Sequence, residues 1–348
     1  MGQYVDIPWG MWQRDNPFRL EFPPDWRVTV CSMHGARTLT QAEIDERISH
    51  PLGRSWQEIA SGAGSACIAV DDLARPTPAR RILPALCEEL RQVGIREVSV
   101  IIALGCHRPL SYAEMIKKIG EKVMSTCRAI NHNPHYGLID LGCSSRGTPF
   151  QVNGLFCRAD LKIVMGSVTP NYMAGYGGGA KLVLPGLSGS ETTRVNHGLA
   201  CGTETGNLSQ PIREDMEELA ELVGVDVAVS CVLNENADIC DLYVGDLKRS
   251  YPKAVERAHD VNLTLAGRPA DILVLNSFPK DNELTQIKSS FNPVFSAQTP
   301  LVRAGGTVVA ISAAWDGIGY HALFGNPAVL VEEHLRRMAE YAGVPLIL

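Results

Sequence analysis

From about residue 65 onward, short apolar runs alternate with longer segments whose apolar residues recur at helical spacing. The runs predict buried strands at residues 67–70, 98–103, 138–141, 161–164 and 225–232. The longer segments predict helices at residues 77–93, 111–123, 213–223 and 251–259. Pro84, inside the first of these helices, predicts a kink or a delayed start. Such alternation is typical of a mostly parallel sheet with helices on its faces.

A second unit of the same kind follows the stretch LTLAGRPAD, which is typical of a linker. It contains predicted strands at residues 272–275 and 307–311, a helix near 283–289 and a final helix at 327–342. We therefore expect an α/β fold of two domains, each with a mostly parallel sheet and helices on both faces. Residues 1–265 would form the larger, cofactor-binding domain and residues 266–348 the smaller one.

The composition narrows the class of protein. Of 348 residues, 45% are hydrophobic and 20% are charged, as in a packed globular chain. The net charge of −6, without a dense cluster of Lys and Arg, argues against a nucleic-acid partner. No apolar stretch is long enough to span a membrane, and the first residues do not resemble a secretion signal, so we expect a cytoplasmic protein without a membrane partner. The ten cysteines form no CxxC pair and are expected to be free thiols.

The first motif lies where the strand at 67–70 ends. Asp71 and Asp72 follow the strand, and Arg75 stands just before a Pro-Thr-Pro sequence. We expect Thr77 to cap the next helix, with Pro78 at its first position. A cation beside a helix N-terminus, at the carboxyl end of a parallel strand, is where α/β folds bind anions. The alternative is a structural turn in which Arg75 pairs with one of the two carboxylates.

The second motif, GCHRP, repeats this arrangement at the end of the next strand. Gly105 frees the backbone, His107 and Arg108 follow, and Ser111 is expected to cap a helix. A histidine at this edge of the sheet can act as a general base near neutral pH. The alternative is a solvent-exposed loop histidine without a role.

The third motif is a run of glycines. Residues 175–180 match GxGxxA, but Pro170 separates them from the preceding strand and the following LVLPG is not helical, which argues against a dinucleotide site. Leu182 excludes a phosphate loop of the GK[ST] type. The run indicates a close approach of the backbone to another group, so we interpret Lys181 as a ligand-pairing lysine and His197 as a metal-binding histidine. A flexible surface loop is the alternative.

Taken together, the stretches DDLARPTP, GCHRP, GYGGGAKLVLPG and the later Asn-His pair resemble the nickel-dependent lactate racemase family in order and spacing. The resemblance extends over roughly residues 60–260, and SFPKDNELTQIK and WDGIGYHALFG are more weakly similar. It implies a nickel-pincer nucleotide as cofactor (pyridinium-3,5-bisthiocarboxylic acid mononucleotide with nickel), which pincer-synthesis enzymes supply. It also implies a small 2-hydroxy acid as substrate.

The resemblance implies roles for individual residues. Lys181 matches the lysine that forms a thioamide with the cofactor, and His197 matches the nickel ligand. His107 matches one of two catalytic histidines, which takes the hydroxyl proton while the carbon-bound hydrogen leaves as a hydride and a transient 2-keto acid forms. The remaining positions expected to bind the cofactor or orient bound groups are Asp71, Asp72, Arg75, Thr77, Gly177, Gly178 and Gly179.

The sequence departs from the family before the glycine run. The second catalytic histidine of the family follows a proline, whereas here Asn171 follows the proline. An asparagine can orient a hydroxyl group but cannot accept its proton at neutral pH. The candidates for the missing base are Tyr172, His321 and Lys288.

A second departure concerns the substrate. Of the family's Tyr-Gln-x-x-Lys motif, Gln286 matches, Thr285 replaces the tyrosine and Lys288 lies one residue too close. We expect four further residues in the catalytic site, namely Arg75, Asn171, Gln286 and Lys288. Because the motif has changed, we also expect a substrate other than lactate. The chain is also shorter than is usual in the family, so we expect that a final segment packing on the first domain is missing.

Other functions remain open. The chain could use the pincer nucleotide on one face of the substrate only, with a redox-like outcome. It could also bind that nucleotide without turnover. Outside the family, an NAD dehydrogenase is the remaining alternative, and the context of the glycine run disfavours it.

Overall fold

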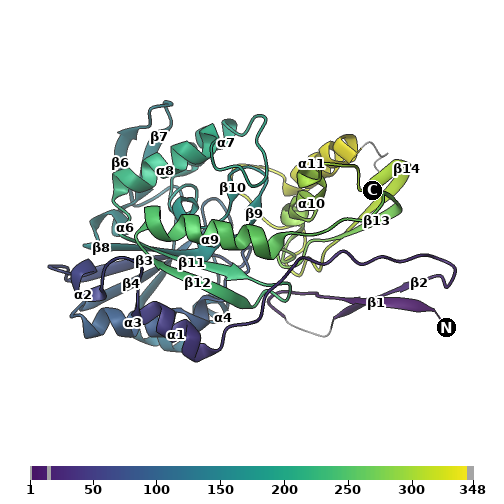
Figure 1. Cartoon of the computed structure of the whole chain (residues 1–348). Coiled ribbons are helices and arrows are strands. Elements are labelled where there is room, and N and C mark those ends of the chain that lie inside the picture. The colour runs from purple at the N-terminus through teal and green to yellow at the C-terminus, as the bar shows by residue number, and fades with distance from the viewer. Residues whose placement is uncertain (1, 14–16, 343–348) are drawn as a thin grey trace.

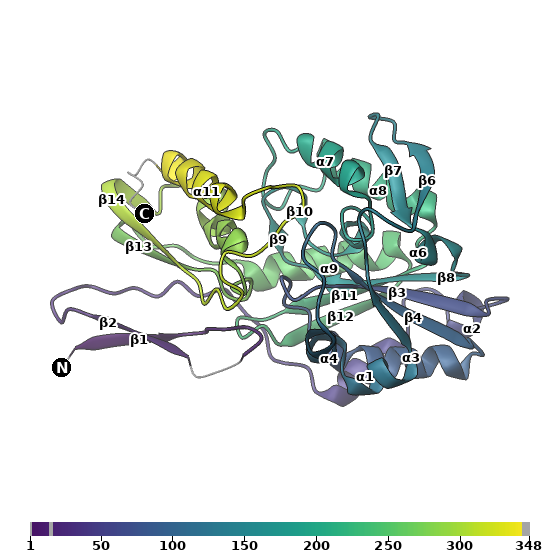
Figure 2. The ribbon, with the colours of Figure 1, turned by 180° about the vertical axis from the view of Figure 1, so that it is seen from behind.

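The computed structural model describes residues 2–13 and 17–342. Its centre is a six-stranded sheet in the order β12-β11-β8-β3-β4-β5 (Figures 1 and 2). The strands are β3 (Ser65–Asp71), β4 (Glu97–Ala103), β5 (Arg128–Asn131), β8 (Leu161–Ser167), β11 (Val227–Leu233) and β12 (Ile239–Gly245). All neighbours are parallel except β11 and β12. The α/β class and the mostly parallel sheet are thus confirmed.

Helices cover both faces of this sheet (Figure 1). On one face lie α1 (Gln41–Ser49), α2 (Trp56–Ile59), α3 (Leu83–Gln92), α4 (Tyr112–Ile119) and α5 (Glu121–Thr126). On the other lie α6 (Gly154–Arg158), α7 (Ser190–Gly198), α8 (Pro211–Val223) and α9 (Leu247–Asn262). Each layer buries its own apolar cluster against the strands, with Leu86 and Leu90 of α3 in one and Met216 and Leu219 of α8 in the other. No helix in the described part of the chain is long and apolar enough to cross a membrane.

The C-terminal part has a smaller core of its own. β13 (Ala270–Asn276) pairs in parallel with β14 (Val302–Ile311), and η3 (Leu284–Phe291), α10 (Asn292–Ser296) and α11 (Pro327–Ala342) accompany them. Leu275, Ile287, Phe291 and Met338 form its apolar cluster. The helix expected near residues 283–289 is a 3-10 helix. Ile272, Val274 and Val309 of the two strands are exposed, so helices do not cover both faces of this small sheet as expected. The division at residue 266 stays a prediction.

The N-terminal residues connect the two parts of the chain. β1 (Gln3–Ile7) and β2 (Phe18–Phe22) form an antiparallel pair beside the C-terminal part (Figure 1). In residues 9–12, which we call the N-terminal strap, the amides of Gly10 and Met11 donate to the Asp281 carboxylate at 2.8 and 3.1 Å. The indole of Trp12 donates to the carbonyl of Leu73 at 2.5 Å. The strap therefore holds the C-terminal part against the loop that follows β3.

Several expected elements differ from the structure. β6 (Leu138–Cys143) pairs with β7 (Pro149–Asn153) in a separate antiparallel ribbon outside the central sheet. The helix expected from residue 77 begins at Leu83, after η1 (Ala79–Arg81), so Pro84 stands in its first turn and delays its start. The helix expected at 111–123 is broken at Gly120, whose φ of +88° disfavours any other residue. β5 and β12 were not predicted.

Candidate active site

The candidate site lies at the carboxyl ends of β3 and β4, where the loops that follow them meet the C-terminal part. The two strands pair in parallel with Asp71 opposite Ala103. Asp72 comes directly after β3, and His107 lies in the loop after β4. Neighbouring parallel strands end at the same edge of a sheet, so the first two sequence motifs meet there.

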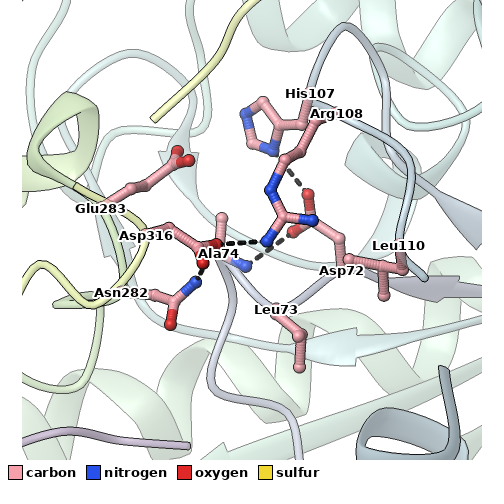
Figure 3. Close-up of a pocket in the computed structure, with 9 residues that line it drawn as sticks. All are labelled: Asp72, Leu73, Ala74, His107, Arg108, Leu110, Asn282, Glu283 and Asp316. Carbon is pink, nitrogen blue, oxygen red and sulfur yellow. Dashed lines mark hydrogen bonds and ion pairs between the residues drawn. The ribbon is translucent and has the colours of Figure 1, made fainter. Parts of the chain in front are cut away.

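Asp72 and His107 form a buried pair. The Nδ1 atom of His107 lies 2.6 Å from the carboxylate of Asp72, and the two side chains are 14% and 6% exposed (Figure 3). Burial lowers the pKa of His107, but the charge and hydrogen bond of Asp72 outweigh burial and the net pKa is raised. Burial raises the pKa of Asp72, but His107 outweighs it and the net pKa falls to about 2. His107 is therefore no solvent-exposed loop residue, and its Nε2 is the basic atom of the neutral ring.

A second histidine, His321, lies against His107. The ring centroids are 5.4 Å apart with the planes at 68°, and the two residues form an isolated antiparallel bridge. Burial, followed by the charge of His107, lowers the pKa of His321 to about 3. Its Nδ1 accepts the backbone N–H of Leu323 at 3.4 Å, which leaves the proton of the neutral ring on Nε2. Of the three candidates for the missing base, His321 is the one that packs on His107.

Arg75 reaches across to the C-terminal part. Its guanidinium donates to Gln286 Oε1 at 3.0 Å, and Gln286 in turn donates to Glu283 at 3.1 Å. The carboxylates of Asp71 and Asp72 have other partners. The alternative in which Arg75 serves only to pair with one of them is therefore wrong.

Asp71, at the end of β3, and Thr77, before η1, form a buried pair. The hydroxyl of Thr77 donates to Asp71 at 2.5 Å and accepts the backbone N–H of Ser167 at 2.7 Å. Thr77 is completely buried and has no capping role, because α3 begins only at Leu83. The structure thus places these two expected cofactor-binding residues in contact with the protein's own groups.

Lys118 of α4 binds the loop that follows β3. It is fully buried, lies 2.7 Å from the Asp71 carboxylate, and donates to the carbonyls of Asp72 and Arg75 at 2.8 and 3.0 Å. Burial lowers its pKa, and the charge of Asp71 opposes this. The sequence did not reveal this residue, because a lysine on an amphipathic helix is ordinarily solvated. Lys118 fixes the backbone that presents Asp72 and Arg75.

The glycine run packs on the protein itself. β9 (Pro170–Asn171) and β10 (Gly175–Tyr176) pair just before it. A Cβ atom at Gly177 or Gly178 would lie 3.1 Å from the carbonyl of Ser167, and one at Gly179 would lie 2.8 Å from the ring of Tyr251. The close approach expected from the sequence is therefore present, and the chain itself provides the groups approached.

Lys181 follows the run in η2 (Gly179–Leu182) and faces Asn171. Its Nζ donates to Asn171 Oδ1 at 3.4 Å, and the same oxygen accepts the N–H groups of Met173 and Ala174 at 3.1 and 2.9 Å. The amide oxygen of Asn171 thus binds the protein itself, and its NH₂ group donates to no other residue in the described part of the chain. Burial, followed by neighbouring positive charges, lowers the pKa of Lys181 well below its usual value. A lysine in that environment is a nucleophilic amine.

Lys280 joins these cations and was not predicted. It is 9% exposed, and no acceptor for its Nζ is found among residues 2–13 and 17–342. Burial, followed by the charge of Arg75, lowers its pKa to about 7. The charges of Arg75 and Lys280 also lower the pKa of Lys181. Cations that repel one another inside a protein indicate an anion-binding site.

Lys288 lies in a different environment. Its Nζ is 4.0 Å from the ring centroid of Tyr172. Burial, followed by the charge of Arg337 in α11, lowers its pKa to about 8. Lys288 therefore lies over Tyr172 and is influenced by the charge of Arg337, whereas Lys280 is influenced by the charge of Arg75.

A small polar pocket opens beside His107 (Figure 3). Arg108 donates to Asp316 at 2.5 Å, and Asn282 donates to the same carboxylate at 2.8 Å. Glu283 lies in the wall contributed by the C-terminal part. Sequence reasoning noted the stretches that contain Asn282, Glu283 and Asp316 but could not place them, because their partners lie far away in the sequence. The lining residues are Asp72, Leu73, Ala74, His107, Arg108, Leu110, Asn282, Glu283 and Asp316.

His197, near the end of α7, is suited to bind a metal. Its Nδ1 is buried without a hydrogen-bond partner in the described part of the chain. Burial, followed by the charge of Lys181, lowers its pKa to about 3, and the neutral imidazole is the form that binds metals. Nowhere in residues 2–13 and 17–342 do three His, Cys, Asp or Glu side chains gather into a metal site. A metal held here needs further ligands from a bound molecule, which fits a pincer nucleotide that carries its own sulfur donors.

Comparisons with known proteins agree with these features. A family model described as "Lactate racemase N-terminal domain" matches residues 14–208. The lactate racemase of Lactiplantibacillus plantarum is 25% identical over 312 residues, which cover 86% of this chain and 72% of that protein. The lactate racemase of Thermoanaerobacterium thermosaccharolyticum is 26% identical over 335 residues, which cover 90% and 75%.

Two solved structures share the fold. The lactate racemase apoprotein from Thermoanaerobacterium thermosaccharolyticum superposes with a TM-score of 0.75 at 22% identity, over 98% of this chain and 85% of that one. A protein from Thermotoga maritima superposes with a TM-score of 0.63 at 18% identity, over 79% and 71%.

Proposed function

The chain belongs to the lactate racemase family, and from this premise we propose that it inverts the hydroxyl-bearing carbon of a 2-hydroxy acid with a nickel-pincer nucleotide. Its family makes it an enzyme, an isomerase. The observation that carries the proposal is the contact between His107 and His321, whose ring centroids are 5.4 Å apart. Asp72 raises the pKa of the first, whereas burial lowers that of the second to about 3. Two neighbouring titratable groups with pKa values driven apart can take different roles in one reaction.

The cofactor would be held on one side of this pair. His197 has a buried ring nitrogen without a protein partner, and Lys181 has an amine whose pKa is strongly lowered. These two residues would provide the nickel ligand and the attachment point. Arg75 and Lys280 would neutralise the anionic groups of the nucleotide and the substrate. When bound, the pincer group supplies a reversible acceptor for the hydride of the substrate carbon.

The proton chemistry belongs to His107. Because Nδ1 contacts Asp72, the Nε2 of the neutral ring faces away from the carboxylate and can accept the hydroxyl proton of the substrate. His321, with its proton on Nε2, would donate a hydrogen bond to the same oxygen and so hold the substrate through the reaction. Return of the proton from His107 restores the hydroxyl group on either configuration of the carbon. One base is thus sufficient, although Asn171 replaces a histidine.

The substrate is expected to be more polar than lactate. The pocket beside His107 is lined by Asn282, Glu283 and Asp316, and the NH₂ group of Asn171, whose oxygen binds the protein itself, would donate to a hydroxyl group of the substrate. Polar groups placed in this way favour substrates with additional hydroxyl groups, and the buried ones, Asn282 and Glu283, penalise analogues that lack them. We therefore propose a sugar acid or another polyhydroxy acid as substrate.

The proposal is tested with protein produced together with pincer-synthesis enzymes. Intact mass and metal analysis should find an adduct on Lys181 and bound nickel. A panel of 2-hydroxy acids with deuterium on the reacting carbon should then be inverted with retention of deuterium, and lactate should be slower than polyhydroxy acids. Loss of deuterium to water would contradict hydride transfer, and lactate as the fastest substrate would contradict the role of the polar pocket. If no acid in the panel is inverted by nickel-loaded protein, the proposed function is wrong.

The test also separates the alternatives. If Asn171 merely replaces a lost base, Asn171→His should restore racemisation of lactate. If its amide binds the substrate or orients Lys181, the same substitution should abolish the native activity. Binding of the nucleotide without any turnover would identify a carrier, and accumulation of a 2-keto acid would identify an enzyme that acts on one face.

A further inference from the structure

Two cysteines outside the active site form a close pair. Cys87 lies in the middle of α3, and Cys127 lies at the end of α5, just before β5. They are 40 positions apart in the sequence, yet their sulfur atoms are 3.7 Å apart. Both belong to the helical layer that contains α1 and α3, on the face of the sheet opposite α8 and α9. The reaction proposed above makes no use of them.

The two thiols have complementary environments. Cys87 is 1% exposed, whereas Cys127 is partly exposed. Arg91, one helical turn after Cys87, directs its guanidinium to the sulfur of Cys127 at 3.7 Å, and the hydroxyl of Thr126 lies 3.8 Å from it. The pair therefore combines an accessible sulfur, beside a permanent positive charge, with a second sulfur that solvent cannot reach.

The charges around the pair distinguish it from the other buried cysteines. The hydrogen bond with Cys87 lowers the pKa of Cys127, and Thr126 and Arg91 lower it further while burial opposes them. Burial raises the pKa of Cys106 and of Cys240 to about 11. Low-pKa thiols that solvent can reach are the ones that oxidants attack.

We propose that Cys87 and Cys127 are a redox-modification site, at which a peroxide oxidises the pair to an internal disulfide. The thiolate of Cys127 attacks the peroxide, forms a sulfenic acid and releases hydroxide. Cys87 then attacks the sulfenic sulfur and displaces its hydroxyl group, which leaves as water with the proton of Cys87. Two thiols and one hydrogen peroxide thus give one disulfide and two waters, and the two electrons come from the sulfur atoms. The sulfurs must approach from 3.7 Å to a bond length of about 2.0 Å, which is a small movement between a helix and a helix end.

The experiment uses the reduced full-length chain and less than one equivalent of hydrogen peroxide. After remaining thiols are alkylated, trypsin separates the pair, because residues 82–91 contain Cys87 and residues 123–128 contain Cys127. Mass spectrometry should find these two peptides joined by a disulfide before the exposed reference thiol Cys143 is oxidised. Recovery of both peptides unlinked and alkylated, while Cys143 is oxidised, would overturn the proposal.

Two variants assign the order of reaction. Cys87→Ser removes the resolving thiol but keeps a hydrogen-bond donor beside Cys127, so Cys127 should accumulate as a sulfenic acid that a cyclic 1,3-diketone traps. Cys127→Ala should leave Cys87 reduced at peroxide concentrations that oxidise the wild-type pair. Circular dichroism checks that each variant is folded, and the partly exposed position of Cys127 makes its truncation the milder of the two. Oxidation of Cys87 in the folded Cys127→Ala protein would contradict the assigned order and the proposal with it.

Discussion

Replacing Asp72 with asparagine removes one negative charge from the pair with His107 and keeps the shape of the side chain. In the folded protein the pKa of Asp72 is lowered from 3.8 to about 2, a difference that corresponds to about 2 kcal/mol. A lowered carboxylate pKa means that this stabilisation is present above pH 3.8 and is lost as the pH falls through about 2. The raised pKa of His107 acts oppositely: its contribution is complete below pH 6.5 and is lost as the pH rises through the folded value. Asp72→Asn should therefore destabilise the protein at neutral pH by about 2 kcal/mol.

The same substitution should change catalysis. Without the carboxylate, burial and the charge of Arg75 lower the pKa of His107. The acidic limb of the kcat/KM profile, where His107 loses its proton, should move to lower pH. The maximal rate should fall by ~100-fold or more, because the ring is a weaker and less well oriented base. Asp316→Asn, a matched change in the same pocket without contact to His107, should leave the position of the limb unchanged.

A limb that stays in place or moves to higher pH in Asp72→Asn would refute this reasoning. The titration of His107 followed by NMR is an independent measurement, and the signal is identified by its absence in His107→Gln. If that signal shifts but the limb of the activity profile does not, His107 has the predicted environment but is not the base.

The remaining predictions concern other parts of the site. Lys118→Met leaves the carboxylate of Asp71 buried without its cation and should lower the free energy of unfolding by about 3–5 kcal/mol, measured in urea. An unchanged unfolding midpoint would show that water or another group replaces the lysine. His197→Ala should remain folded and lose its nickel in metal analysis, so full nickel occupancy in the variant would exclude this ligand. Lys280→Met should raise KM for the 2-hydroxy acid by ~10- to 100-fold, as expected for a lost charge-assisted hydrogen bond. Lys288→Met should raise KM less than Lys280→Met does. If Lys288→Met raises KM more, Lys288 and not Lys280 binds the substrate.

The sequence was sufficient to locate those parts of the site that follow from strand endings. Asp72 and His107 each come after an apolar run, and the rule that parallel strands end at one edge brings them together. Lys181 and His197 were identified through the order and spacing of motifs, and the structure places positive charge from the first close enough to lower the pKa of the second. The backbone alone decides where such residues lie, and their roles in the reaction stay predictions.

Residues that depend on side-chain packing could not be found this way. Lys118 stands on an amphipathic helix and became a buried cation only because Asp71 and two backbone carbonyls lie above it. Lys280 lies in the loop after β13, and it comes near Arg75 only because the C-terminal part packs on the loop after β3. No periodic pattern in the sequence predicts that packing. The cap expected at Thr77 was wrong for a similar reason, because a buried carboxylate competes for its hydroxyl.

The N-terminal strap has a consequence for how the enzyme is made. Gly10 and Met11 find their acceptor, Asp281, 271 and 270 positions further along the chain. A ribosome therefore releases the strap, and the segments that carry Asp72 and His107, well before the acceptor exists. A partly synthesised chain can form the central sheet, but it has neither Gln286 nor His321. If the chain binds the nucleotide as proposed above, the complete set of cations that would meet it exists only after Lys280 has been synthesised, so we expect the cofactor to bind after that point.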